Sequence, residues 1–420
     1  MNTGDTAWIL ASSALVLLMT PGLAFFYGGM VRGKSVLNMM MMSFLAMAII
    51  PILWVLYGYS IAFDDDLGGG LLGGFNLIGL KDMNMDTAFG TVPAYVFVAF
   101  QLMFAILTVA LISGAIADRA KFGGWAVFVA IWVSVVYFPV AHWVFSFDGD
   151  KGFKGGWIAN QLGAIDFAGG TAVHINAGAA GLALALVLGK RVGWKRDPMR
   201  PHNLPFVLLG AGLLWFGWYG FNAGSALGAN GLAGLAFVNT TVATAAAILG
   251  WLLVEAIRDK KATSLGGASG AVAGLVAITP ACGVLTPVGS IGLGITAGIL
   301  CALAVGLKYK FGYDDSLDVV GVHLVGGLVG TLLIGFLASG DVGILYGGNL
   351  DQLGKQAVAA GAVLAYSFIL TYIIGTVIDK TIGFRITEED EVTGIDQVEH
   401  LETAYEFAGS GGGSHLTKGV

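Results

Sequence analysis

Charged side chains are scarce in this sequence. Asp, Glu, Lys and Arg make up 11% of the 420 residues, whereas hydrophobic residues reach 56%. An average soluble domain carries roughly 25% charged residues, so the composition excludes an ordinary soluble enzyme and gives no sign of a nucleic-acid-binding protein. It predicts an all-α polytopic membrane protein, because a lipid-exposed chain without strand alternation satisfies its backbone within helices.

Cysteine is also rare, and glycine is not. Cys282 and Cys301 are the two cysteines, and both stand in apolar stretches. We expect two buried thiols rather than a disulfide. The 66 glycines are typical of helices that pack closely within lipid, where small residues let two backbones approach.

Long apolar runs define the predicted topology. Eleven of them are long enough to cross a bilayer, at 7–31, 36–62, 92–117, 122–146, 168–189, 204–223, 235–257, 268–284, 288–307, 319–338 and 356–379. With the N-terminus outside, seventeen of the 21 Lys and Arg residues fall on the inner side. This excess of positive charge predicts a cytoplasmic C-terminus, and we expect the chain in the plasma (inner) membrane.

The chain divides into a predicted transmembrane domain at 1–380 and a cytoplasmic tail at 381–420. The tail is polar and acidic, and its Gly/Ser run at 409–414 is typical of a flexible segment. Several apolar residues before that run favour docking of the tail onto the cytoplasmic face. These residues are Ile386, Ile395, Tyr405 and Phe407.

Two histidines stand out because they lie inside predicted spans. His174 and His323 are each surrounded by apolar and glycine residues, one in each half of the chain. An ionisable side chain at bilayer depth is costly, so it usually faces a partner or a pathway. Histidine can also exchange a proton near neutral pH. The two positions therefore indicate a functional pair on a permeation route.

The halves of the chain correspond weakly. Asp166 precedes His174 in the fifth span, and Asp318 precedes His323 in the tenth. Five spans per half would insert the second half upside down, which predicts an inverted 5+5 repeat with a peripheral eleventh helix. Interhelical hydrogen bonding, a two-ligand metal site and a bis-histidine haem are the alternative roles for the histidines. No third metal ligand stands beside them, and we expect no cofactor.

Five motifs resemble the ammonium transporter family, the Amt/Mep branch of the Amt/Mep/Rh superfamily. They occur in the family's order along nearly the whole chain, at 25–29 (FFYGG), 166–178 (DFAGGTAVHINAG), 217–225 (GWYGFNAGS), 279–283 (TPACG) and 318–323 (DVVGVH). The resemblance implies a homotrimer of eleven-span subunits that takes up ammonium or methylammonium, each subunit with its own pore. It implies a transporter and not an enzyme.

The resemblance also implies roles for single residues. His174 and His323 correspond to the twin histidines that line the pore, and Phe104 and Phe221 to the aromatic pair that closes its outer end. Ser225 corresponds to the hydroxyl that binds ammonium in the outer vestibule. Three further positions match the buried acid needed for conduction and two residues near the pore, namely Asp166, Trp218 and Thr279.

Two positions depart from the family pattern. The family often has Trp at the outer end of the fourth span, where this chain has Phe145, which offers a weaker π face and no indole N–H. In the tail, Leu401 replaces a common Gly between His400 and Glu402. The family's tail couples subunits and binds PII-type signalling proteins, so such a protein is an expected partner.

Two other functions remain as alternatives. An ammonium sensor would signal through a cytoplasmic partner, although no output domain is recognisable after the tail. A passive gas channel for ammonia would move no charge, but Ser225 and the Amt-type motifs favour ammonium transport.

Overall fold

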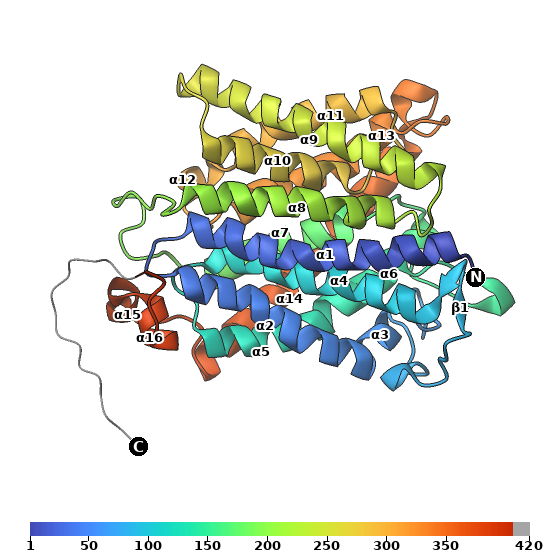
Figure 1. The fold of residues 1–420 in the computed structure, drawn as a ribbon, viewed down its shortest axis with the longest axis horizontal. Helices are drawn as coiled ribbons and strands as arrows, with labels where there is room; N and C mark the ends of the chain where they lie inside the picture. Colours follow the sequence, from blue (N-terminus) through green and yellow to red (C-terminus); the bar gives the residue numbers. More distant parts are fainter. Residues whose placement is uncertain (406–420) are drawn as a thin grey trace.

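Long helices run side by side along one axis in the computed structural model, which describes residues 1–405 (Figure 1). The predicted docking residue Phe407 and the Gly/Ser run at 409–414 lie outside the described residues. The two ends of the bundle differ in what they carry. One end holds the N-terminus and a short hairpin, and the opposite end holds the last helices, α15 and α16.

Helices and helical turns form nearly all of the regular structure. The first half contains α1 (Thr3–Met30), α2 (Val36–Leu53), η1 (Trp54–Gly58), α3 (Tyr59–Phe63), η2 (Ile78–Leu80), α4 (Ala94–Ile112), η3 (Ser113–Ile116), α5 (Phe122–Trp132), η4 (Val133–Tyr137), α6 (Phe138–Phe145), η5 (Asp150–Gly152), η6 (Ile158–Leu162), η7 (Gly170–Ile175) and α7 (Asn176–Leu188). The hairpin consists of β1 (Ala88–Phe89) and β2 (Val92–Pro93), paired antiparallel.

The second half is also helical. It contains α8 (Leu204–Gly224), α9 (Gly231–Arg258), α10 (Ser264–Ile278), α11 (Pro287–Ala304), α12 (Leu307–Phe311), η8 (Val320–Leu324), α13 (Val325–Leu337), η9 (Ile344–Tyr346), α14 (Leu350–Thr381), α15 (Glu388–Thr393) and α16 (Ile395–His400). The turns η1, η4, η6, η7 and η8 are π-helical. Such turns are rare and gather at functional sites.

The helices confirm a polytopic membrane fold. Within residues 1–405, ten helical segments are long and apolar enough to span a bilayer. The eighth predicted run coincides with α10, which is apolar but only 15 residues long. It ends ahead of Pro280, where proline cannot supply a backbone N–H. The count of eleven spans therefore stays a prediction.

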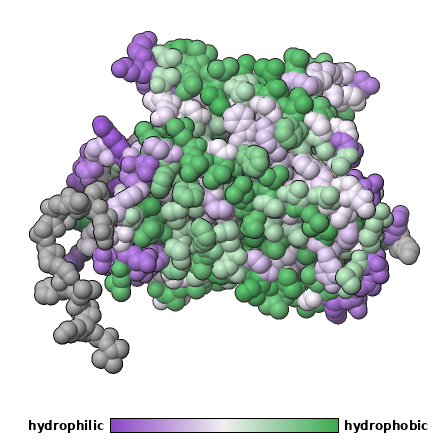
Figure 2. Space-filling model, viewed as in Figure 1, coloured by the Kyte–Doolittle hydropathy of each residue, from purple (hydrophilic) through white to green (hydrophobic). Residues whose placement is uncertain are grey.

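Lipid-facing and core-facing surfaces are well separated. Large apolar side chains on the outside of the bundle are exposed, among them Ile52, Leu249 and Ile257 at 62, 68 and 66%. Figure 2 shows a broad hydrophobic band between two more polar ends. This band is the surface expected of a bundle whose middle is surrounded by hydrocarbon.

Glycine brings the two halves into close contact. Gly210 on α8 faces α1 so closely that a Cβ there would lie 2.2 Å from the backbone N of Phe26. Because any larger residue would force α1 and α8 apart, this contact explains one of the many glycines. Both cysteines are buried and free, as the composition predicted.

The end opposite the hairpin is fixed by the last helices. Asp396 accepts hydrogen bonds from the backbone N–H groups of Leu37 and Asn38 at 3.0 and 2.8 Å, so it caps the start of α2. Ile386 and Ile395 are buried, in agreement with the docking predicted for this segment. The domain boundary at residue 380 itself remains a prediction.

Candidate functional site

The two intramembrane histidines meet in the interior of the bundle. Their Nδ1 atoms lie 3.3 Å apart, and their rings have centroids 5.4 Å apart with an interplanar angle of 16°. His174 and His323 are 0 and 2% exposed. The structure thus brings together two side chains separated by 149 positions. The Nε2 atom of His174 is buried without a hydrogen-bond partner in the described part of the chain.

Each histidine stands on a π-helical turn that begins with a capped N-terminus. His174 belongs to η7, and Asp166 accepts hydrogen bonds from the backbone N–H groups of Gly169, Gly170 and Thr171 at 2.7, 2.7 and 2.8 Å. The Thr171 hydroxyl donates to the same carboxylate. Asp166 therefore satisfies the free N–H groups that open this helix.

The counterpart of Asp166 in the second half is Asp315, and the predicted correspondence with Asp318 is wrong. Asp315 accepts from the N–H groups of Val319 and Val320 at 3.1 and 2.8 Å. Asp318 instead adopts a left-handed backbone with φ of 63° and pairs with Lys308 at 2.6 Å. Asp166 and Asp315 each stand eight residues before their histidine, a spacing that the sequence could have revealed.

A glycine sets the distance between the two histidine-bearing segments. A Cβ on Gly178 of α7 would lie 2.4 Å from the backbone N of Leu324, the residue after His323. Real Cβ atoms do not approach a backbone nitrogen so closely. Gly178 therefore allows η8 to rest directly on α7, which brings His323 within reach of His174.

Two phenylalanines stack next to the histidine pair. The rings of Phe104 on α4 and Phe221 on α8 have centroids 4.3 Å apart and are inclined by 31°. Both are almost fully buried, at 1 and 0% exposure. The ring of Phe221 also lies 6.1 Å from that of His174. The order along this line is therefore Phe104, Phe221, His174 and His323.

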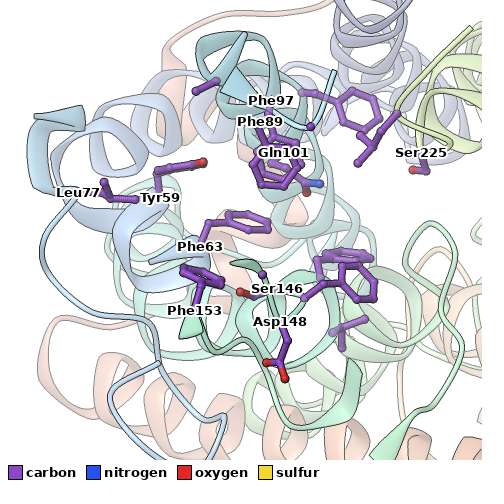
Figure 3. Close-up of a pocket in the computed structure, with 18 of the residues that line it drawn as sticks. Tyr59, Phe63, Leu77, Phe89, Phe97, Gln101, Ser146, Asp148, Phe153 and Ser225 are labelled. Atoms are coloured by element: carbon purple, nitrogen blue, oxygen red, sulfur yellow. The ribbon is translucent and has the colours of Figure 1, made fainter. Parts of the chain in front are cut away.

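A large pocket lies on the other side of Phe104, at the end of the bundle that carries the hairpin. Its volume is about 900 Å³, and its walls include Phe104, Phe145, Asp166 and Ser225. Figure 3 shows Ser225 on one side of the pocket and Tyr59 on the other. The structure thus gathers the residues predicted for ammonium recruitment around one cavity.

The orientation of Ser225 decides what its hydroxyl can do. The Oγ atom donates to the carbonyl of Phe221, one turn earlier on the same helix, at 2.8 Å. Because the hydroxyl has a single proton, its lone pairs remain available to accept a hydrogen bond. Phe145 lines the same pocket, with its ring 6.3 Å from Phe104 at an angle of 72°. An aromatic face and an acceptor therefore line the same space.

Trp218 and Thr279 support the site from behind. The ring of Trp218 is stacked on His174 with centroids 5.4 Å apart and an angle of 18°. Its indole N–H donates to the Thr279 hydroxyl at 2.8 Å, and that hydroxyl lies 2.7 Å from the carbonyl of Leu275. Asn222, absent from the predicted set, lies 3.2 Å from the same hydroxyl. This network fixes the indole and, through it, the orientation of His174.

The histidine pair offers hydrogen-bonding nitrogens without the ligand number of a metal centre. Within residues 1–405, no group of three or more His, Cys, Asp or Glu side chains is arranged to hold a metal ion. The arrangement can exclude water at Phe104 and Phe221, accept or donate hydrogen bonds at the imidazoles and hold a cation at the pocket.

Comparisons with known proteins agree with this geometry. A model of the Ammonium Transporter Family matches residues 7–405. An ammonium transporter of Mycobacterium tuberculosis (strain H37Rv) is 62% identical over 436 aligned positions, which cover 97% of this chain and 91% of the relative. An ammonium transporter of Bacillus subtilis (strain 168) is 48% identical and covers 97% of this chain and 99% of its own.

Solved structures show the same fold. The crystal structure of Saccharomyces cerevisiae Mep2 superposes with a TM-score of 0.83 at 33% identity, covering 92% of this chain and 91% of that one. A structure described as a sensor Amt protein gives a TM-score of 0.87 at 30% identity, covering 94 and 98%.

Proposed function

The chain belongs to the ammonium transporter family, and from this premise we propose that it recruits ammonium at the pocket, removes one proton and conducts ammonia past the histidine pair. The observation that carries the proposal is the continuous order of pocket, Phe104, Phe221, His174 and His323. In the proposed orientation the N-terminus is outside, so the pocket faces the exterior. A homotrimer in the plasma membrane, with a PII-type protein at the opposite face, completes the proposal.

Recruitment needs a site that favours a cation while it still keeps part of its water. The lone pairs of Ser225 can accept an ammonium N–H. The rings of Phe104 and Phe145 present π faces to the same pocket, and a cation over an aromatic face gains about 0.5–1 kcal/mol at an exposed site. These contacts concentrate ammonium ahead of the phenylalanine pair without removing it fully from water.

Deprotonation makes the passage selective. The pKa of ammonium lies about two units above pH 7, and each unit corresponds to about 1.4 kcal/mol. Removing a proton from ammonium at pH 7 therefore costs roughly 3 kcal/mol. Burying an unpaired cation in an apolar pore costs far more. Potassium has no proton to lose and stays charged, so a pore that admits only neutral ammonia excludes potassium. The buried rings of Phe104 and Phe221 keep water and ions out.

The histidine pair can then bind both products of deprotonation, ammonia and the proton. Neutral imidazole carries one donor and one acceptor nitrogen, so the pair can hydrogen-bond ammonia in an otherwise apolar passage. A proton can pass between the two Nδ1 atoms, which already lie 3.3 Å apart. We propose that this relay carries the proton along with ammonia, so that net charge crosses the membrane.

Reconstituted protein tests the transport proposal. Liposomes containing the protein and a pH-sensitive dye would be exposed to an ammonium gradient and, as a control, to a potassium gradient of the same ionic strength. We expect a saturable internal pH change with ammonium that exceeds the change in empty liposomes, and none with potassium. Equal responses in protein-containing and empty liposomes would reject transport and favour the sensor alternative.

A further inference from the structure

The pocket is far larger than its proposed substrate requires. Its volume is about 900 Å³. Ammonium is close to a water molecule in size, and a water molecule occupies about 30 Å³ in the liquid. We propose that the part of the pocket away from Ser225 binds the apolar substituent of an organic ammonium ion, whose charged group lies at the Ser225 side. The proposed ligand class is a primary amine with one aryl or alkyl arm.

Four aromatic side chains and one leucine form that part of the pocket, which we call the aromatic lobe and define by Tyr59, Phe63, Leu77, Phe89 and Phe97. The hairpin residue Phe89 stacks on Phe97 of α4 with centroids 3.6 Å apart and an angle of 12°. Phe63 packs edge-on against Phe97 at 5.0 Å. In Figure 3, Tyr59 and Leu77 lie on the side opposite Ser225. Such walls favour an apolar ring or chain.

A pocket-facing amide without a hydrogen-bond partner in the described structure points to a polar ligand in addition. Gln101 lines the pocket and is 8% exposed, and its side chain makes no hydrogen bond in the described structure. It lies beside Phe97 in Figure 3, between the aromatic lobe and Ser225. The carbonyl oxygen of Gln101 is therefore free to accept a hydrogen bond from a ligand ammonium N–H in the pocket.

The charges around the pocket select a cation. Asp82, Asp148 and Asp150 belong to its walls, and none of the described lining residues is Lys or Arg. Asp148 is partly engaged, since it accepts from the N–H of Gly155 at 2.9 Å and pairs with Lys154 at 3.5 Å. The three carboxylates disfavour an anionic ligand, and aromatic walls bind organic ammonium groups well. A neutral lipid tail would offer no hydrogen-bond donor to Gln101 and no positive charge to the three carboxylates.

The stacked phenylalanines would hold such a ligand in the pocket. Phe104 and Phe221 pack at 4.3 Å and leave no room for an aryl group. The organic ammonium ion would therefore compete with ammonium for the Ser225 side and would not be transported. This last consequence rests on the proposed function, whereas binding itself does not.

Calorimetric titration of the purified full-length protein in phosphatidylcholine nanodiscs tests the binding. The probe is 2-phenylethylammonium, and 2-phenylethanol is its neutral control. Leu77→Trp would fill the aromatic lobe, and Gln101→Leu would remove the amide. Leu71→Trp is the matched control, because Leu71 is 52% exposed and is not among the lining residues.

We expect saturable binding of 2-phenylethylammonium that ammonium displaces, and binding of 2-phenylethanol at least about tenfold weaker. Leu77→Trp and Gln101→Leu should each weaken the binding, whereas Leu71→Trp should not. Equal affinity for the neutral control, or unchanged binding in both Leu77→Trp and Gln101→Leu, would overturn the proposal. Because titration needs no transport, transport without binding would reject only the lobe, and binding without transport would reject only the proposed function.

Discussion

The Nδ1 atoms of His174 and His323 face each other at 3.3 Å. Two bare nitrogen lone pairs at this distance would repel, and two N–H groups would collide, so one Nδ1 carries the proton and the other accepts it. The two imidazoles therefore hold complementary tautomers, and their Nε2 atoms differ, one being an acceptor and the other a donor. When one Nε2 atom takes up a proton, a second proton passes between the Nδ1 atoms and a third leaves from the other Nε2 atom, the two rings exchange these roles and one proton has crossed the pair.

The close approach of α7 and η8 predicts that Gly178 is essential for the pair. Gly178→Ala places a Cβ at 2.4 Å from the backbone N of Leu324, so η8 must shift and His323 must move away from His174. We expect ammonium uptake to fall by more than about tenfold, although alanine ordinarily favours a helix by about 1 kcal/mol over glycine. Uptake into reconstituted liposomes measures the effect.

Gly212 supplies the control for that substitution. It lies in the middle of α8, and a Cβ there would meet nothing within 4 Å. Gly212→Ala should leave uptake unchanged and raise the melting temperature slightly. Equal uptake by both variants would show that the contact between Gly178 and Leu324 does not position the histidines.

The two helix-capping carboxylates should be equally important. Asp166→Asn and Asp315→Asn each replace a charged acceptor of several backbone N–H groups by a neutral amide. We expect each variant to lose about 1–3 kcal/mol of stability, together with reduced uptake, because η7 and η8 carry the histidines. Thermal unfolding in detergent measures the loss. Asp86→Asn, at an exposed loop position, should behave like the unaltered protein.

The aromatic ring of Phe145, which lines the pocket together with Ser225, should set the affinity for ammonium. Phe145→Trp provides a larger π face and an indole N–H, so we expect KM for ammonium to fall by about two- to fivefold, with kcat little changed. Phe145→Leu, which keeps the volume but removes the π face, should raise KM. A KM that responds to neither substitution would remove Phe145 from the recruitment site.

Buried ion pairs at the end of the bundle that carries α15 and α16 should make the fold less stable in acid. Arg191 pairs with Asp118 at 3.1 Å and with Asp314 at 2.8 Å. Burial alone would raise the pKa of both carboxyls, but Arg191, with Arg32 beside Asp118 and Arg119 near Asp314, outweighs burial and holds each pKa below the usual value. Groups of this kind stabilise the fold above their unfolded pKa of about 3.9. Their contribution is lost as pH falls through that value toward the lower folded pKa.

Melting temperatures between pH 7 and pH 3, for the unaltered protein and Arg191→Lys, check this prediction. Lysine keeps the charge but loses the two-pronged contact, so both carboxyl pKa values should rise and the difference between the two proteins should shrink in acid. A difference that stays constant from pH 7 to pH 3 would contradict it. Burial raises the pKa of Asp315 to about 6. Asp315 titrates in both proteins, so its contribution to the melting temperature cancels in the comparison.

The sequence predicted the membrane class, the pairing of His174 with His323 and the neighbourhood of Phe104 and Phe221. These predictions succeeded because apolar runs, intramembrane histidines and family motifs are local features. The equivalence of Asp315 with Asp166 was not predicted because Asp318, and not Asp315, belongs to the motif at 318–323, although both Asp166 and Asp315 stand eight residues before a histidine. Gly178 and Gln101 could not be chosen from so many similar residues, since their importance depends on which helix packs opposite.

The charge carried by transport tests the central role of the histidine pair most directly. Currents would be recorded on a solid-supported membrane after an ammonium jump, with a potassium jump as control, for the unaltered protein and for the double variant His174→Ala/His323→Ala. The account predicts a saturable ammonium current without a potassium current, and loss of the ammonium-selective current in the double variant. An undiminished current that remains selective for ammonium over potassium in the double variant would contradict it.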